Sequence, residues 1–410
     1  MATRGLGYEG GVQTRCWPFL LLAVATTAHA QIDPVKRELF QMGYNQALEG
    51  APPLSAYVFY YLNKPDFLQD TNLTLRLAIA PTYLDSELGI HGVFGDNTDL
   101  GIGVAGGGFA DSYYEVRGGT FYPSESFDGH GGEVSVSLYH IFNPGDRIPL
   151  NGLLRAGFHY SDYERNDDTA ANFVVPDDQE AFHVRTGLRW GGEEPTLFPD
   201  VAMEISAWYE GQFRLHTESY GYNNDRSFQP DSHQFWARAL LAYTLPQSKQ
   251  YFSLNLTAGT SIQADRFSAY RLGSLLPLGS EFPLDLPGYF YEELSARQFA
   301  LLGGNYSLPL DRQGHWNLDA VAATAVVDYL PGLGQPGNWN NGVGGGILYK
   351  RSDAFKILVS YAYGVDAIRD GSRGAQSIGI LLQLDWEQAK PFFHMGESHE
   401  IQGQPRLFFE

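Results

Sequence analysis

The residues that could do chemistry in this sequence are single positions rather than compact motifs. Four histidines lie at polar positions of segments that alternate apolar and polar residues: His140, His159, His183 and His315. A catalytic or metal-binding role would need partners from other segments, and local spacing supplies none. No G-x-S-x-G, H-E-x-x-H or P-loop pattern occurs. We therefore expect no catalytic residue, no metal site and no cofactor. The chain is predicted not to be an enzyme, with a membrane lipid hydrolase using a Ser–His pair as the alternative.

A glycine-rich stretch at residues 101–106 matches the pattern G-x-G-x-x-G. In a dinucleotide-binding fold this pattern opens a helix whose N-terminus holds the pyrophosphate. Three consecutive glycines at 106–108 do not favour a helix start. We interpret the stretch as a strand in which glycines allow bending or close packing.

Charged side chains also fall on the polar faces of the alternating segments. These are Arg155, His183, Arg185, Arg189, Glu204 and Arg238, and we expect them to face a water-filled interior. Two interpretations stay open. The side chains pair with one another, or they form a ring that sets ion selectivity.

The chain carries 47 acidic and 27 basic residues, a formal net charge of −20. Nucleic acid is not an expected partner, because phosphate contacts need clusters of basic residues. Acids are concentrated in segment 161–180, where seven of them accompany a single base, Arg165. A solvated loop explains this composition. Bridging of divalent cations or lipopolysaccharide is the alternative, although no EF-hand spacing supports it.

Strand-like alternation is clearest from residue 132 onward. Within 181–190, Phe182 and Leu188 alternate with His183 and Arg189. A period of two places the two sets on opposite faces of a strand. The apolar set would face lipid in a membrane barrel and the core in a soluble sandwich, so periodicity alone does not decide between these folds.

We predict about sixteen strands, at 54–62, 71–81, 86–94, 99–107, 113–122, 132–142, 151–160, 181–190, 200–213, 232–245, 250–272, 289–309, 315–329, 341–350, 354–364 and 375–386. From residue 143 the connections alternate between short and long. In outer-membrane barrels short turns are periplasmic and long loops extracellular. The sequence therefore predicts an all-β protein, a single transmembrane antiparallel β-barrel with both termini in the periplasm.

The N-terminus has the pattern of an export signal. Arg4 and Arg15 precede an apolar run, and Ala28-His29-Ala30 forms a small-x-small cleavage site. We therefore predict a signal peptide at 1–30, a short periplasmic segment at 31–53 with helical or plug character, the outer-membrane barrel at 54–386, and a periplasmic or lumenal tail at 387–410. The predicted location is the bacterial outer membrane.

The segment between the eleventh and twelfth predicted strands carries the most specific local signal. Pro287-Gly288-Tyr289 lies in the long loop, and Asp328 lies in Ala325 to Tyr329 of the thirteenth strand. This arrangement resembles the C-terminal barrel of the bacterial surface-antigen superfamily, which includes outer-membrane insertases, two-partner-secretion transporters and patatin-linked barrels. We expect no polypeptide-transport-associated domains in this chain, because residues 31–53 are too few to form them. In that superfamily the loop folds inward and its arginine contacts the acid of strand thirteen. Here Pro287 replaces the arginine, so we expect a latch of Pro287, Gly288, Tyr289 and Asp328 in which Asp328 takes another partner.

The last predicted strand resembles the signal recognised by the barrel-assembly machinery. Its outward residues are Ile380, Leu382, Leu384 and Trp386. The resemblance implies a role in protein or lipid translocation or insertion. The implied partners are outer-membrane lipid and lipopolysaccharide, the assembly machinery during insertion, and a periplasmic partner. A passive, porin-like diffusion pore with acidic extracellular loops is the alternative, and a purely structural surface protein is a further one.

Overall fold

The computed structural model describes residues 33, 35–352 and 354–394. The predicted signal peptide, 1–30, and the part of the predicted tail beyond residue 394 lie outside the described residues. Among the described residues, no helix combines the length and the apolarity needed to cross a bilayer.

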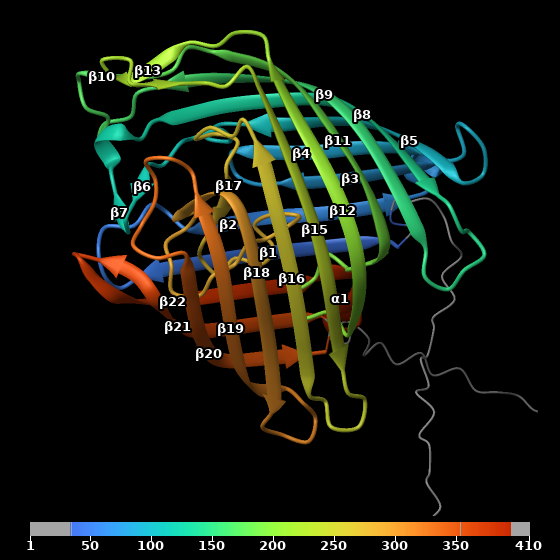
Figure 1. Cartoon of the computed structure of the whole chain (residues 1–410). Helices are drawn as coiled ribbons and strands as arrows, with labels where there is room; N and C mark the ends of the chain where they lie inside the picture. The colour runs from blue at the N-terminus through green and yellow to red at the C-terminus, as the bar shows by residue number, and fades with distance from the viewer. Residues whose placement is uncertain (1–32, 34, 353, 395–410) are drawn as a thin grey trace, which may run out of the picture.

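Sixteen long strands of the described chain form one closed antiparallel barrel (Figure 1). In order around the wall they are β1 (Arg37–Ala47), β2 (Ala56–Pro65), β3 (Leu73–Ile79), β4 (Tyr83–Ile90), β5 (Thr98–Gly107), β8 (Asp128–Ile141), β9 (Leu150–Glu164), β11 (Gln179–Gly192), β12 (Val201–Arg214), β15 (Asp231–Thr244), β16 (Tyr251–Ile262), β18 (Leu294–Pro309), β19 (Trp316–Tyr329), β20 (Trp339–Arg351), β21 (Phe355–Arg369) and β22 (Ser372–Asp385). The first strand closes on the last, from the pair Leu39 and Asp385 to the pair Ala47 and Ser377. Closure removes free strand edges, as a barrel in lipid requires.

Shorter elements lie in the connections and after the last strand. They are η1 (Phe67–Gln69), β6 (Val116–Arg117), β7 (Thr120–Phe121), η2 (Pro123–Glu125), β10 (Phe173–Val174), β13 (Ser219–Tyr222), β14 (Arg226–Ser227), β17 (Tyr270–Leu272) and α1 (Trp386–His394). Helix α1 begins the predicted tail and lies beside β1, where Lys390 pairs with Glu38 at 3.7 Å. The long connections 108–127, 165–178, 215–230 and 263–293 emerge at one end of the barrel, which we call the long-loop end. Strands β1 and β22 begin and finish at the opposite, short-turn end.

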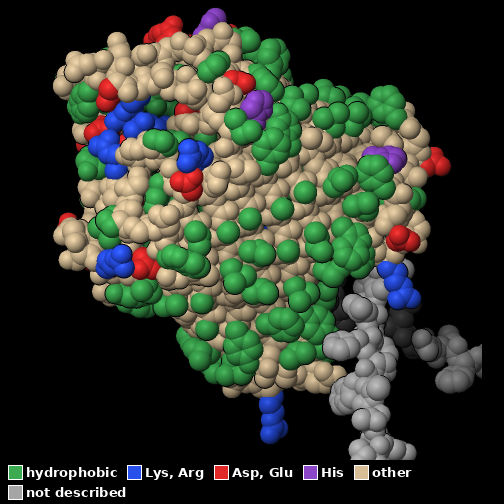
Figure 2. Space-filling view, viewed as in Figure 1, with side chains coloured by type: hydrophobic (Ala, Val, Ile, Leu, Met, Phe, Trp, Pro, Cys, Tyr) green, Lys and Arg blue, Asp and Glu red, His purple; other side chains and the backbone are tan. Residues whose placement is uncertain are grey.

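The apolar residues of the strands face outward and the polar residues face inward. On β22 the side chain of Ile378 is 46% exposed, whereas Ser377 and Gln383 are almost fully buried. Figure 2 shows hydrophobic side chains over most of the wall on one face, with charged side chains mainly toward the edges. This polarity is opposite to that of a soluble sandwich, so it decides in favour of the barrel that alternation alone left open.

The expectation for residues 31–53 was wrong, because residues 37–47 form strand β1 rather than a helix or plug. Its inward set contains Leu39, Gln41 and Gly43, so the contrast between its two faces is weak and the period of two is hidden. The predicted strand 113–122 was also wrong. That segment contains only the short hairpin β6–β7, and its apolar Tyr113 and Val116 are buried among loops. The two errors cancel, so the predicted total of sixteen strands is confirmed.

The glycine-rich stretch 101–106 lies in strand β5. A Cβ atom at Gly101 would approach the carboxyl carbon of Glu87 to 2.9 Å. The glycine therefore makes room for an inward carboxylate, and the prediction of a strand at this position is confirmed.

Candidate functional site

The connection between β16 and β18 folds into the barrel, and we call residues 263–293 the inward loop (Figure 1). Leu286, Tyr289 and Phe290 in its second half are almost fully buried. A loop of this length stays ordered only if its contacts outweigh the entropy lost on fixing it. Three sets of contacts hold it, at its end, at the proline–glycine motif and at its tip.

A buried ion pair fixes the end of the inward loop, one residue before β18. Arg369, the last residue of β21, donates to both carboxylate oxygens of Glu293, at 2.9 and 2.8 Å. The two side chains are 3% and 0% exposed. The Arg369 guanidinium also lies 3.5 Å from the centre of the Phe290 ring. Planar pairing with the carboxylate and stacking on an aromatic face are both arginine-specific contacts.

The motif Pro287-Gly288 packs backbone against backbone on the barrel wall. A Cβ atom at Gly342 of β20 would lie 2.2 Å from the carbonyl oxygen of Pro287. A Cβ atom at Gly288, whose φ is +83°, would lie 2.0 Å from the backbone nitrogen of Gly364 in β21. Glycine is therefore required on both surfaces. The next residue, Tyr289, donates its hydroxyl to Asn340 Oδ1 of β20 at 3.5 Å.

The tip of the inward loop rests on the wall formed by β11, β12 and β15. Arg185 and Arg189 each donate to the carboxylate of Glu281 at 3.0 Å. We call the wall residues that receive the tip, namely Arg185, Arg189, Trp208, Trp236 and Arg238, the tip cradle. The ring of Phe282 lies 5.2 Å from that of Trp208 and 5.5 Å from that of Trp236, which is the range of favourable aromatic pairs.

The tip cradle and the Glu293–Arg369 pair lie on nearly opposite sides of the barrel. Around the wall, β11 is the eighth strand and β21 the fifteenth. The inward loop therefore crosses the lumen from one wall to the other at this level.

Two carboxyl groups of the inward loop have shifted pKa values of opposite sign. For Glu281, burial acts to raise the pKa, but the attraction of Arg185 and Arg189 outweighs it, and the pKa lies below its ordinary value. For Asp285, burial raises the pKa to about 7, although the N–H group of Leu276 donates to its carboxylate and opposes the shift. Charge at the tip is stabilised, whereas charge at Asp285 is not.

A second segment enters the lumen from the short-turn end, and we call residues 193–200 the inward turn. It leaves β11 and reaches the far wall, where Gln41 of β1 donates to the carbonyl oxygen of Pro195 at 2.9 Å. Leu197 donates its N–H group to Gln383 of β22 at 2.8 Å. The side chain of Leu197 packs in one apolar cluster with Leu276 of the inward loop. The two segments thus meet inside the barrel.

Solved structures share this architecture at low sequence identity. CdiB from Acinetobacter baumannii matches with a TM-score of 0.55 at 10% identity over 86% of this chain and 60% of its own. BamA from Haemophilus ducreyi lacking POTRA domains 1–3 matches with a TM-score of 0.55 at 12% identity, over 86% and 71%. CdiB from Escherichia coli matches with a TM-score of 0.54 at 10% identity, over 86% and 64%. The chain thus spans less than two thirds of either CdiB. No known family model and no curated protein matches the sequence.

The six charged residues expected in the lumen all have inward partners. Arg155 donates to Glu87 at 2.8 Å, His183 lies 3.0 Å from Glu133, Arg185 pairs with Glu210 and Glu281, Arg189 with Glu204 and Glu281, and Arg238 with Glu193. They lie on the adjacent strands β9, β11, β12 and β15. These residues lie on one side of the barrel and are paired with one another or with further acids. This arrangement agrees with the interpretation that they form ion pairs, and not with a ring that sets ion selectivity.

The loop motif and Asp328 are not brought together among the described contacts. Asp328 pairs with Arg297 of β18 at 2.7 Å, and its side chain is 47% exposed. The neighbouring Val327 is fully buried, so alternation along β19 turns Asp328 to the outer face. The motif instead contacts β20 and β21. On β22, Ile380, Leu382 and Leu384 lie on the outer face, and Leu381 and Gln383 point inward. The predicted strand end at Trp386 was wrong, because β22 ends at Asp385 and the exposed Trp386 begins helix α1.

Sequence reasoning missed Glu281, Phe282, Glu293 and Arg369. The charged partners of Glu281, Glu293 and Arg369 lie 76 to 96 residues away in the chain, and the ring partners of Phe282 lie on the distant strands β12 and β15, so no local spacing marks them. The one available signal was the pair Arg185 and Arg189, which alternation places on the same face of β11. On the neighbouring strand β12, Glu210 lies opposite Arg185, but Arg189 has an acid, Glu204, only at a diagonal position.

Proposed function

We propose that this chain is a gated outer-membrane barrel of surface-antigen type that moves or inserts protein or lipid, with the inward loop as its gate. The observation that carries the proposal is the loop that spans the lumen between Arg369 and the tip cradle. The likeness in fold between this chain and the CdiB and BamA barrels also supports a barrel of surface-antigen type. The proposed mechanism is conformational and non-enzymatic.

Location and orientation follow from the same proposal. The predicted export signal at 1–30 and the outward apolar wall fit the outer membrane. Short turns face the periplasm in such barrels. The start of β1, the end of β22 and helix α1 would therefore lie on the periplasmic side. The outward face of β22 would be read by the barrel-assembly machinery, and lipid and lipopolysaccharide would surround the wall. A periplasmic partner would approach the inward turn.

The alternative, a passive diffusion pore, makes a different electrical prediction. Purified, folded protein in a planar lipid bilayer should show little or flickering conductance if the inward loop closes the lumen. A variant in which residues 275–284 are replaced by a short Gly–Ser linker should show large, steady steps that scale with salt. Large steady steps from the unaltered protein would overturn the gate and favour the pore.

Insertion is tested separately, with a defined probe. Vesicles containing the protein are mixed with an unfolded eight-stranded outer-membrane barrel, and folding of that probe is followed by its heat-modifiable gel mobility. Faster folding than in protein-free vesicles supports insertion activity. Equal rates, with a closed lumen in the bilayer experiment, would overturn insertion of barrels while leaving the gate intact.

A further inference from the structure

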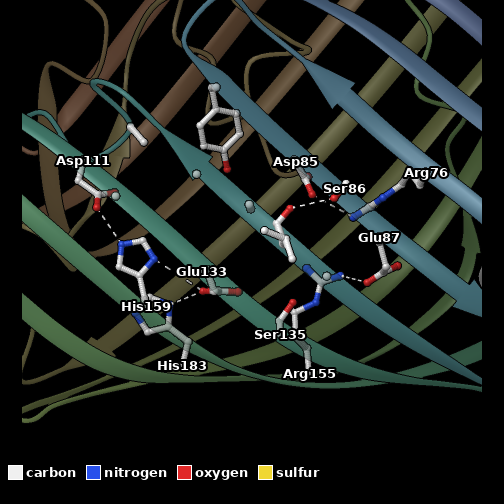
Figure 3. A pocket seen from close by; sticks show the side chains of 17 residues that line it. Arg76, Asp85, Ser86, Glu87, Asp111, Glu133, Ser135, Arg155, His159 and His183 are labelled. Atoms are coloured by element: carbon white, nitrogen blue, oxygen red, sulfur yellow. Dashed lines mark hydrogen bonds and ion pairs between the residues drawn. The ribbon is translucent and has the colours of Figure 1, made fainter.

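Three inward side chains on adjacent strands converge near the long-loop end, on a stretch of wall that adjoins the tip cradle at β11 (Figure 3). They are Glu133 of β8, His159 of β9 and His183 of β11. Glu133 Oε2 lies 3.0 Å from His183 Nδ1 and 3.9 Å from His159 Nδ1. One potential ligand atom from each residue falls within 4.8 Å of the other two. The imidazole rings are stacked, with centres 5.2 Å apart.

The backbone is shaped to allow this convergence. Glu133 faces His159 across β8 and β9, whereas His183 faces Gly157 across β9 and β11. A Cβ atom at Gly157 would lie 2.9 Å from the Glu133 carboxylate. The missing side chain at Gly157 thus lets Glu133 cross β9 and reach a histidine two strands away.

A fourth residue orients one of the histidines. Asp111, in the 108–127 connection, lies 2.8 Å from His159 Nε2 and accepts a hydrogen bond from Ser161 at 2.6 Å. It occupies space that a side chain at Gly131 would fill, since a Cβ atom there would lie 1.8 Å from its carboxylate. In metal sites, the histidine nitrogen that does not bind the metal usually donates to a carboxylate, which fixes the orientation of the ring.

The distribution of protons leaves room for a cation. If the Nε2–H group of a neutral His159 donates a hydrogen bond to Asp111, then the Nδ1 atom of the same ring has no proton, and its lone pair is directed at Glu133. His183 Nε2 is buried and has no hydrogen-bond partner in the structure. The three facing atoms, which are His159 Nδ1, His183 Nδ1 and Glu133 Oε2, then have a single proton between them, in the hydrogen bond of His183 with Glu133. When a metal ion binds, this proton would move to His183 Nε2 or leave for solvent, and the ion would then satisfy all three acceptors.

We propose that Glu133, His159 and His183 bind a divalent transition-metal ion of the zinc class. Bonds of about 2.0 Å in a tetrahedral site place ligand atoms about 3.3 Å apart, and the observed 3.0 and 3.9 Å bracket that value. The fourth position faces a cavity of about 270 Å³ and would hold water. Through Asp111, the ion would fasten the 108–127 connection to three wall strands.

The test uses purified, folded barrel stripped with EDTA and titrated with Co²⁺, followed by competition with Zn²⁺. We expect one equivalent of Co²⁺, with the visible absorption of a tetrahedral site, displaced by Zn²⁺. The double variant His159→Gln/His183→Gln should lose this equivalent. Asp111→Asn should keep the stoichiometry and weaken affinity about 10- to 100-fold, and Gly157→Ala should also weaken it.

The matched control is His91→Gln. His91 lies 2.9 Å from one carboxylate, Asp99, but outside the three-residue group, so this variant should bind like the unaltered protein. Heat-modifiable mobility confirms that every variant is folded. Absence of binding in the folded, unaltered protein would overturn the site and leave the two histidines as hydrogen-bond partners of Glu133 and Asp111. Equal binding by the folded double variant would also overturn it.

Discussion

Arg369 and Glu293 join the end of the inward loop to the rim of β21 through two parallel hydrogen bonds in a site closed to water. Such a pair costs free energy to desolvate and returns it only while both partners are present. The pair therefore adds little net stability, but it favours the one position of the inward loop in which both partners meet.

The first prediction concerns this pair. Glu293→Gln and Arg369→Met each leave one buried polar partner without its counterpart, so each should lower the free energy of unfolding by about 3–5 kcal/mol. The double variant should lose less than the sum of the two. Urea-dependent folding in lipid vesicles measures the three values as a double-mutant cycle. Additive losses would show that the pair is not energetically coupled.

The second prediction concerns pH and Asp285. Its pKa of about 7 in the folded protein exceeds the unfolded value of about 3.9, so the folded state binds the proton more tightly. Stability contributed by the protonated form is therefore lost as pH rises from about 4 to about 7. Asp285→Asn stays neutral, so it should be more stable than the unaltered protein at pH 8 and equal at pH 4. The expected difference is about 1–2 kcal/mol, with allowance for water in the lumen.

The temperature at which half of the protein has changed its gel mobility on heating, determined at several pH values, measures this effect. Asp167→Asn serves as the control, because Asp167 is exposed in a loop at the long-loop end and should leave the pH profile unchanged. A parallel profile for Asp285→Asn and the unaltered protein would refute the assignment of the shifted group.

The third prediction concerns the opposite sign at Glu281. Because its pKa in the folded protein is lowered, its contribution to stability is present above the ordinary value of 4.5 and is lost as pH falls through the lower, folded value. Bilayer conductance of the unaltered protein should therefore rise in acid. Glu281→Gln should raise the opening frequency at neutral pH, by roughly 5-fold or more for the loss of one charge-assisted anchor. Its openings should respond little to acid.

Glu210→Gln is the matched control, since Glu210 also pairs with Arg185, at 2.7 Å, but lies on the wall rather than on the loop. It should leave acid-dependent opening in place. If both variants open equally, Arg185 rather than the loop contact controls the gate.

The sequence predicts most of the wall and little of what fills it. From β8 onward the strands alternate strongly, as Phe182 and Leu188 do with His183 and Arg189 on β11, so their positions follow from local pattern. β1 was missed because Leu39 and Gly43 on its inward face blur the contrast. The inward loop was predicted as an element, and Arg185 and Arg189 were predicted to face the lumen. Which residue of the loop would meet them depends on the path of a long connection, which local periodicity does not encode.

The last prediction concerns the contact between the Pro287-Gly288 motif and the wall. Gly342→Ala adds a Cβ atom that would lie 2.2 Å from the carbonyl oxygen of Pro287, so the loop must move or the wall must bend. Overpacking of this kind costs about 1–3 kcal/mol, and displacement of the loop should also raise bilayer conductance. Gly303→Ala is the control, because a Cβ atom at this barrel glycine of β18 would meet nothing within 4 Å. We expect Gly303→Ala to match the unaltered protein in both measurements. If Gly342→Ala lowers stability without raising conductance, the wall deforms while the loop stays, and the proline–glycine motif supports the barrel rather than the gate.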